Sequence, residues 1–260
     1  MMEKNYHTHT YRCNHATNED ERAYIESAIQ GGLKVLGFSD HVPMPPFPEP
    51  AYYSGFRMKR ELLPDYVQTI LDLKKEYAND IEILLGFEAE YYPQMFDAML
   101  EMLSPYPYDY LIQGQHFLGN EVEGDSVSRV TTTQADIARY VSQVCEGMKT
   151  GAFSYLAHPD IFRFEGDDAV YARQMRKICE TANALDMPLE CNLLGLRDGR
   201  HYPCDRFFRL VAECGCKVII GCDSHSAASL SNTQNKQDAN DMLARLGVTN
   251  IVQDIRLRRR

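Results

Sequence analysis

The segment IEILLGFEAE, residues 81–90, joins an apolar run to two carboxylates. The run Ile81–Gly86 is short and rich in β-branched and aliphatic side chains, a pattern typical of a buried strand. Glu88 follows this run, and Glu90 comes two residues later. The same unit, an apolar run that leads into polar residues able to bind metal ions, recurs along the chain.

Seven such runs alternate with stretches of helical period. The predicted strands are Lys4–Tyr6, Val35–Phe38, Ile81–Gly86, Tyr108–Gln113, Phe153–Ala157, Pro188–Cys191 and Lys217–Gly221. The predicted helices are Glu19–Gln30, Lys59–Tyr77, Met95–Leu103, Thr133–Lys149, Ala169–Leu185, Asp205–Glu213 and Asn235–Leu246. This alternation indicates parallel βαβ units and an α/β fold. Because no break in composition marks a boundary, we predict a single domain over residues 1–260.

The charge balance limits the classes of partner. The formal net charge is -10, and a phosphate polyanion needs a basic face to release its counterions. We therefore expect no nucleic-acid partner and no anionic membrane partner. A small phosphorylated substrate stays compatible with this charge, since bound metal cations reverse the local field. The sequence leaves the oligomeric state open.

Every predicted strand leads into a residue type that binds metal ions. These residues are His7, His9, Asp40, His41, Glu88, Glu90, His116, His158, Asp160, Glu190, Asn192, Asp223 and His225. The carboxyl ends of all strands in a (β/α) barrel converge on one face, where active sites are built from several strands at once. We therefore expect these side chains to meet in one site.

The histidines make the collective interpretation stronger than any single one. Of the eight histidines, six lie on predicted strand ends and His15 lies in the first loop. Only His201 falls outside, in a polar turn where we expect a structural role. Imidazole and carboxylate together suit zinc, manganese and ferrous iron.

The cysteines and the first residues bear on the compartment. The chain has eight cysteines and no CxxC pair, and the spacing of Cys214 and Cys216 is poor for a chelate. No apolar signal segment precedes the first histidine motif. We expect reduced, mostly buried cysteines in a cytoplasmic protein.

The ordered motifs HTHT (7–10), CNH (13–15), SDH (39–41), GFEAEYY (86–92), GQHF (114–117), AHPD (157–160), ECN (190–192) and GCDSH (221–225) resemble the PHP (polymerase and histidinol phosphatase) family. Within it, they are most similar to stand-alone histidinol-phosphate phosphatases. The resemblance implies a distorted, TIM-barrel-like barrel of seven strands. It also implies a cluster of three divalent metal ions.

The resemblance assigns ligands to each ion. It gives His7, His9, Glu88 and Asp223 to the first, and a bridging Glu88 with His116 and His158 to the second. It gives His15, His41 and His225 to the third. Asp40 is expected either as a ligand of the third ion or as a partner that orients its neighbours.

The activity implied is hydrolysis of L-histidinol phosphate to L-histidinol and phosphate, a step of histidine biosynthesis. A hydroxide bridging the first two ions would attack phosphorus, and the ions would neutralise charge on the phosphoryl oxygens. The leaving alkoxide needs a proton, for which the candidates are Asp160, Asp223 and a histidine of the third ion, His225.

Recognition of the substrate is expected from residues just past the strand ends. Arg163 and Arg197 are predicted to bind phosphate oxygens, because the planar guanidinium matches them, and Arg57 is a weaker candidate. Glu90 or Asp160 would accept the substrate amine. The proline-rich stretch Val42–Gly55 is the kind of loop that lies over a site as a lid or wall.

Two other functions remain open from the sequence. The same metal centre could serve a phosphodiesterase or nuclease of the PHP type, although the acidic charge and the missing basic, aromatic groove count against it. The chain could also be a non-catalytic metal-binding module. The complete ligand set and the two candidate arginines speak against this possibility.

Overall fold

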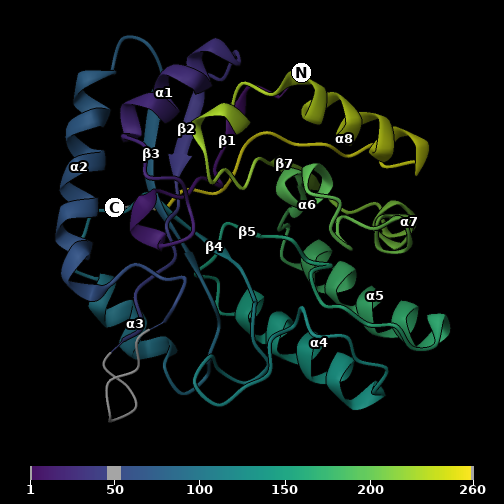
Figure 1. Ribbon diagram of the computed structural model, residues 1–260. Helices are drawn as coiled ribbons and strands as arrows, with labels where there is room; N and C mark the ends of the chain where they lie inside the picture. Colours follow the sequence, from purple (N-terminus) through teal and green to yellow (C-terminus); the bar gives the residue numbers. More distant parts are fainter. Residues whose placement is uncertain (1, 46–53, 259–260) are drawn as a thin grey trace.

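In the computed structural model, seven parallel strands stand side by side in sequence order and helices surround them (Figure 1). The structure describes residues 2–45 and 54–258. The strands are β1 (Lys4–Asn5), β2 (Val35–Phe38), β3 (Glu82–Ala89), β4 (Tyr110–Gln113), β5 (Tyr155–Leu156), β6 (Leu189–Asn192) and β7 (Val218–Gly221). All seven predicted strands are confirmed, and so is the α/β barrel.

The helices also follow the predicted order. They are α1 (Glu21–Gln30), α2 (Leu63–Glu76), α3 (Phe96–Leu103), α4 (Gln134–Lys149), α5 (Asp168–Ala184), α6 (Leu193–Arg197), α7 (Asp205–Cys214) and α8 (Thr233–Arg245), with short 3-10 turns at Tyr11–Cys13, Arg60–Leu62 and Ala227–Ser229. The five-residue helix α6 was not predicted, because it is too short to show a helical period. None of the described helices is both long and apolar enough to cross a membrane.

The predicted end of the third strand was wrong by three residues. Strand β3 continues through Glu88 to Ala89, where Glu88 pairs with Ile112 of β4 and forms a bridge with His41. The carboxylate looked like a strand terminator in the sequence, but β3 is paired on both sides at this point. Glu88 is therefore held by the sheet itself and not by a loop.

The barrel closes between the segments that follow its first and last strands. Beyond the ends of β1 and β7, Thr8 and Ser224 form an isolated parallel bridge. His9 N donates to Ser224 O over 2.8 Å, and Ser224 N donates to His7 O over 3.0 Å. The sheet is thus a nearly closed, distorted barrel, and its last link lies next to the histidines of the first motif.

Tyr110 fills the interior of the barrel. Its hydroxyl donates to the carbonyl of Tyr6 over 2.7 Å and lies 3.1 Å from that of Phe38. A Cβ atom at Gly37 or Gly86 would lie within 2.3 Å of the Tyr110 side chain. The two glycines in β2 and β3 therefore make room for one large aromatic side chain.

The C-terminal segment seals the opposite end of the barrel, at the amino ends of the strands. Val252 N donates to Val218 O over 2.8 Å, and Tyr6 Oη donates to Gln253 O over 3.0 Å. Val252 and Ile255 pack against the side chains that fill the barrel interior. This segment acts as the floor of the barrel, and it leaves the carboxyl ends of the strands open.

We expect Ile255→Asp to lower the free energy of unfolding by about 1–2 kcal/mol, because it places a charge against the apolar interior and removes part of the buried surface. Leu257→Asp is the matched control, since Leu257 lies in the same segment but is 42% exposed. Urea denaturation of both variants measures the difference. An equal loss in the two variants would contradict the sealing role.

Candidate metal centre

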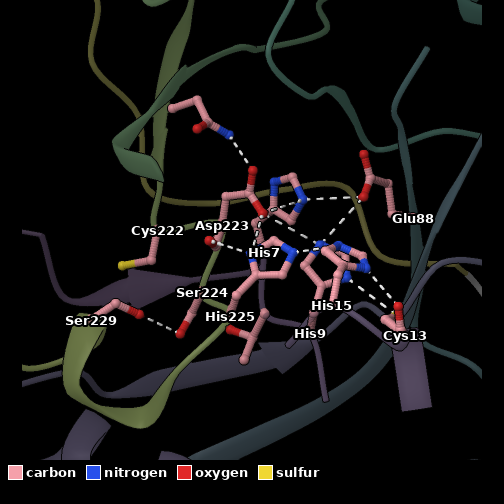
Figure 2. Close-up of polar contacts among 12 residues, drawn as sticks. His7, His9, Cys13, His15, Glu88, Cys222, Asp223, Ser224, His225 and Ser229 are labelled. Carbon is pink, nitrogen blue, oxygen red and sulfur yellow. Dashed lines mark hydrogen bonds and ion pairs between the residues drawn. The ribbon is translucent and has the colours of Figure 1, made fainter. Parts of the chain in front are cut away.

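Four buried side chains from the ends of β1, β3 and β7 converge at the open end of the barrel (Figure 2). His7 Nε2 lies 3.3 Å from Glu88 Oε2 and 3.5 Å from Asp223 Oδ1. His9 Nε2 lies 3.3 Å and 3.4 Å from the same two oxygens. Ligand atoms placed tetrahedrally at about 2.1 Å from an ion are about 3.4 Å apart. These four atoms therefore have the spacing of a single coordination shell.

The charge of this cluster fits a divalent cation. Burial raises the pKa of a carboxyl group, but the surrounding imidazoles outweigh it, so the pKa values of Glu88 and Asp223 lie well below their usual range. Burial lowers the pKa of His9, and Asp223 and Glu88 outweigh burial and raise that pKa to about 9. Without an ion, protons on imidazoles offset the buried carboxylates. A bound ion would take the place of those protons.

Unpaired polar atoms support the same conclusion. His9 Nε2 and Asp223 Oδ1 are buried and have no hydrogen-bond partner within the described part of the chain. The same holds for His41 Nδ1. A buried polar atom without a partner costs about 1–3 kcal/mol, so several in one cluster call for a ligand. The donor set, imidazole and carboxylate, suits zinc, manganese or ferrous iron.

The other oxygen of Glu88 faces the residues expected around a second ion. His158 Nε2 lies 2.9 Å and His116 Nε2 3.7 Å from Glu88 Oε1. His41, expected around the third ion, also reaches Glu88, with Nδ1 3.1 Å from Oε2, the oxygen that faces His7 and His9. Glu88 is thus in contact with five histidines and is placed to bridge two ions.

The remaining histidines expected for a third ion lie together at the rim. His15 Nε2 is 2.7 Å from His225 Nε2, and the His9 ring stacks on that of His225 with centroids 4.5 Å apart. Two ligand atoms of one ion are more than about 3 Å apart, so an ion here would separate the two rings. His225 also reaches the first cluster, since its Nδ1 lies 3.4 Å from Asp223 Oδ1.

A second layer of acceptors fixes the orientation of the imidazoles. Glu190 Oε1 lies 2.8 Å from His7 Nδ1, and Glu90 Oε1 lies 2.5 Å from His116 Nδ1. When Nδ1–H donates to a carboxylate, Nε2 is left free to bind a metal. Glu190 was recognised in the sequence only as a strand-end residue without a role. Glu190 lies two residues before Asn192, so both side chains point to the same face of β6, and this spacing could have indicated that Glu190 also faces the metal centre.

Two predicted residues have surroundings that differ from the expected role, and a third, Asp40, has surroundings that fit one of its two expected roles. Glu90 lies behind His116 and pairs with Arg57 over 2.9 Å, so its carboxylate is already occupied. Arg57 is buried between Glu90 and Glu121. Asp40 accepts hydrogen bonds from Thr10 N and Thr10 Oγ1, both 2.5 Å long, and its Oδ1 lies 4.0 Å from His9 Nδ1. This geometry makes Asp40 a support for the first motif.

Two of the candidate ligands have unusual backbone conformations. His158 has φ of 29° and Asp223 has φ of 44°, both in the region that favours glycine. Each residue lies two positions after the last residue of its strand. Conformations of this kind persist where the surrounding structure holds them in place, and they are common at binding sites. The turn aims both side chains inward.

A cavity of about 1000 Å³ opens above the cluster. Glu88, Asp223 and His225 lie in its wall together with both predicted arginines, Arg163 and Arg197. The wall also contains residues that the sequence did not single out, namely Phe56, Phe117, Leu194, Asp198, Arg200 and Tyr202. His201, for which we expected a structural role, lies in the wall as well and bonds to Ile161 O over 2.6 Å.

Two further predictions concern the surroundings of this cavity. Asp160 is buried and is not among the described residues of the wall; its Oδ2 accepts from Cys204 N over 2.6 Å, and burial raises its pKa to about 6. Of the predicted lid Val42–Gly55, residues 46–53 lie outside the described part of the chain. Just past that loop, Phe56 packs edge-on against His41 with ring centroids 4.9 Å apart.

We expect Arg57→Met to lower the free energy of unfolding by about 3–5 kcal/mol, because it leaves Glu90 and Glu121 buried without their cation. Thermal and urea denaturation of the metal-free protein measure this loss. Arg22→Met is the control, since Arg22 pairs with Glu76 on the surface and its loss should leave the midpoint unchanged. Equal midpoints for the two variants would show that the buried pair contributes little.

Comparison with known proteins places this centre in a family. The chain matches the PHP domain over residues 5–193. A probable histidinol-phosphatase from Deinococcus radiodurans is 29% identical over 228 residues, which cover 84% of this chain and 85% of that protein. A histidinol-phosphatase from Bacillus subtilis is 35% identical over 121 residues, 45% of each chain.

A solved structure has the same fold. It is the histidinol phosphate phosphatase from Lactococcus lactis, in complex with zinc, L-histidinol and phosphate. It is 18% identical, covers 98% of both chains and gives a TM-score of 0.73. At this identity the likeness concerns the fold. Because the family match spans residues 5–193 of 260, this chain belongs to the PHP domain family.

Proposed function

We propose that this chain is a metal-dependent phosphomonoesterase that hydrolyses L-histidinol phosphate to L-histidinol and phosphate. The observation that carries the proposal is the convergence of His7, His9, Glu88 and Asp223 below a cavity whose wall contains Arg163 and Arg197. Cation-binding atoms and guanidinium groups on one cavity suit a substrate with a phosphate dianion. The names of the relatives from Deinococcus radiodurans and Bacillus subtilis support the substrate.

We propose further that the cluster holds three divalent ions, with zinc, manganese and iron as the candidates. His7, His9, Glu88 and Asp223 would hold the first, Glu88, His116 and His158 the second, and His15, His41 and His225 the third. The zinc of the Lactococcus lactis complex is consistent with the first of these metals. When bound, such ions lower the pKa of a water molecule and neutralise charge on phosphoryl oxygens.

The residues of the chain would bind the phosphate and supply a proton. Arg163 and Arg197 both line the cavity, where each can direct N–H groups at phosphate oxygens. For protonation of the leaving oxygen, Asp223 and His225 line the cavity, whereas Asp160 lies behind it. This placement favours Asp223 or His225 over Asp160.

The substrate is tested by phosphate release from L-histidinol phosphate, a generic aryl phosphate and a phosphodiester, each with metal-loaded protein. We expect kcat/KM for histidinol phosphate to exceed that for the aryl ester by at least about 100-fold, which corresponds to two favourable polar contacts. Faster cleavage of the diester would identify the PHP-type phosphodiesterase instead. Similar values for both monoesters would contradict the specific substrate.

The metal centre is tested by Glu88→Gln. We expect fewer bound ions per chain and a loss of kcat of roughly 100-fold or more, since even residues that only orient metal ligands cost 10–100-fold. Glu82→Gln is the matched control, because Glu82 is exposed at the start of the same strand. Elemental analysis and the phosphatase assay give the two readouts. Wild-type metal content and activity in Glu88→Gln would rule out this centre.

A further inference from the structure

The short helix α6 is tied at its start to the carboxylates of the metal centre. Asn192, its N-cap residue, accepts from Gly195 N over 3.0 Å. The amide nitrogen of the same side chain donates to Asp223 Oδ2 over 3.0 Å and to Glu190 Oε2 over 2.9 Å. One buried asparagine therefore fixes the position of α6 relative to Asp223. Any group at the far end of this five-residue helix is held at a defined place above the centre.

The end of α6 turns the chain back toward the cavity. Gly199 has φ of 63°, and Arg200 N donates to Gly195 O over 2.9 Å. A left-handed residue just after a helix is the usual way to reverse the chain there, and glycine adopts it without strain. Arg197 is the last residue of α6 and Arg200 comes after the turn, and both line the cavity.

Asp198 connects the two arginines. Its Oδ1 accepts from Arg197 Nε over 2.9 Å, and its Oδ2 accepts from an Arg200 terminal nitrogen over 3.2 Å. The other terminal nitrogen of Arg200 donates to the hydroxyl of Tyr202 over 3.0 Å. Tyr202 is buried, and its ring packs against that of His158 with centroids 6.1 Å apart. The Arg200 guanidinium thus has two side-chain partners, and one of them, Tyr202, packs against a candidate metal ligand.

This arrangement fits a phosphate oxygen as the ligand of Arg200. A guanidinium carries five N–H groups, and the contacts to Asp198 and Tyr202 account for two of them. A partly ordered guanidinium loses less side-chain entropy when it binds an anion. Asp198 is a poor partner for a substrate cation, because both its oxygens already accept from arginine.

We propose that Arg200 is a phosphate-binding residue in addition to Arg163 and Arg197, and that Asp198 is the positioning residue that holds its guanidinium at the cavity wall. The inference rests on the proposed function, since it assumes a phosphate ester as the substrate. It adds a residue pair that belongs to the turn after α6 and not to any strand end.

The test compares Arg200→Ala, Arg200→Lys and the wild type, all loaded with metal. Calorimetry with inorganic phosphate gives Kd, and the phosphatase assay gives KM, kcat and the inhibition constant of L-histidinol. For Arg200→Ala we expect phosphate Kd and substrate KM to rise by about tenfold or more, the effect of one lost charge-assisted hydrogen bond. The inhibition constant of histidinol, which lacks phosphate, should change less than about twofold. Arg200→Lys should fall in between, because it keeps the charge without the fork.

The role of Asp198 has its own readout. Asp198→Ala should raise KM with kcat kept within about twofold. Its effect should be smaller in the Arg200→Ala background than in the wild type, because the part that acts through Arg200 is already lost there and only the part that acts through Arg197 remains. Asp198→Glu should restore part of the loss. Additive effects would show that Asp198 acts independently of Arg200. Arg209→Ala is the matched control, since Arg209 is exposed on α7 and pairs with Asp205.

The outcomes separate this inference from the proposed function. Unchanged phosphate Kd in Arg200→Ala, or a change confined to histidinol binding, would overturn the inference while wild-type phosphatase activity stands. A wild type that hydrolyses no phosphomonoester would overturn the proposed function. Melting curves and bound metal of the variants are compared with those of the wild type first. If Arg200→Ala loses metal, the Arg200→Lys variant is used for the test instead. A wild-type phosphate Kd and KM in Arg200→Lys would then overturn the role of the guanidinium group.

Discussion

Two buried carboxylates, Glu88 and Asp223, share the imidazoles of His7 and His9 at distances of 3.3–3.5 Å. Burying such a concentration of negative charge is costly unless cations offset it. Much of the surrounding structure serves this requirement. The sheet holds Glu88 within a paired strand, and the left-handed turn at residue 223 directs the other carboxylate to the same point.

The hydrogen-bond acceptors behind the candidate ligands determine which nitrogen of each imidazole ring faces the metal centre. Glu190 and Glu90 accept from the outer nitrogens of His7 and His116, and the carbonyl of Cys13 lies 2.5 Å from the outer nitrogen of His15. These acceptors hold the orientation of each ring and keep the outer nitrogen protonated when an ion takes the place of the inner proton. The rings of His7 and His116 are thereby preorganised, whereas an ion between His15 and His225 would have to move their rings apart.

The sequence predicted the strand order, the helix order and the gathering of histidines at one end of the barrel, because period and strand-end position are local properties. It could not show that Glu90 turns to Arg57, since that depends on Arg57 and Glu121 meeting across a loop. It also missed Arg200 and Tyr202. Their place in the cavity follows from a five-residue helix and one left-handed glycine, neither of which has a periodic signal.

The floor of the barrel has a consequence for how the chain reaches its fold. Glu3 N donates to the side chain of Gln253, and the bridge between Thr8 and Ser224 closes the sheet. The first strand therefore gains its last partners only from segments more than 200 residues further on. Contacts of such high sequence separation slow folding, because the entropy of closing a long loop is lost before the contacts contribute any stabilising free energy. During synthesis, His7 and His9 therefore remain without part of their ligand set until Asp223, His225 and the C-terminal segment have been made.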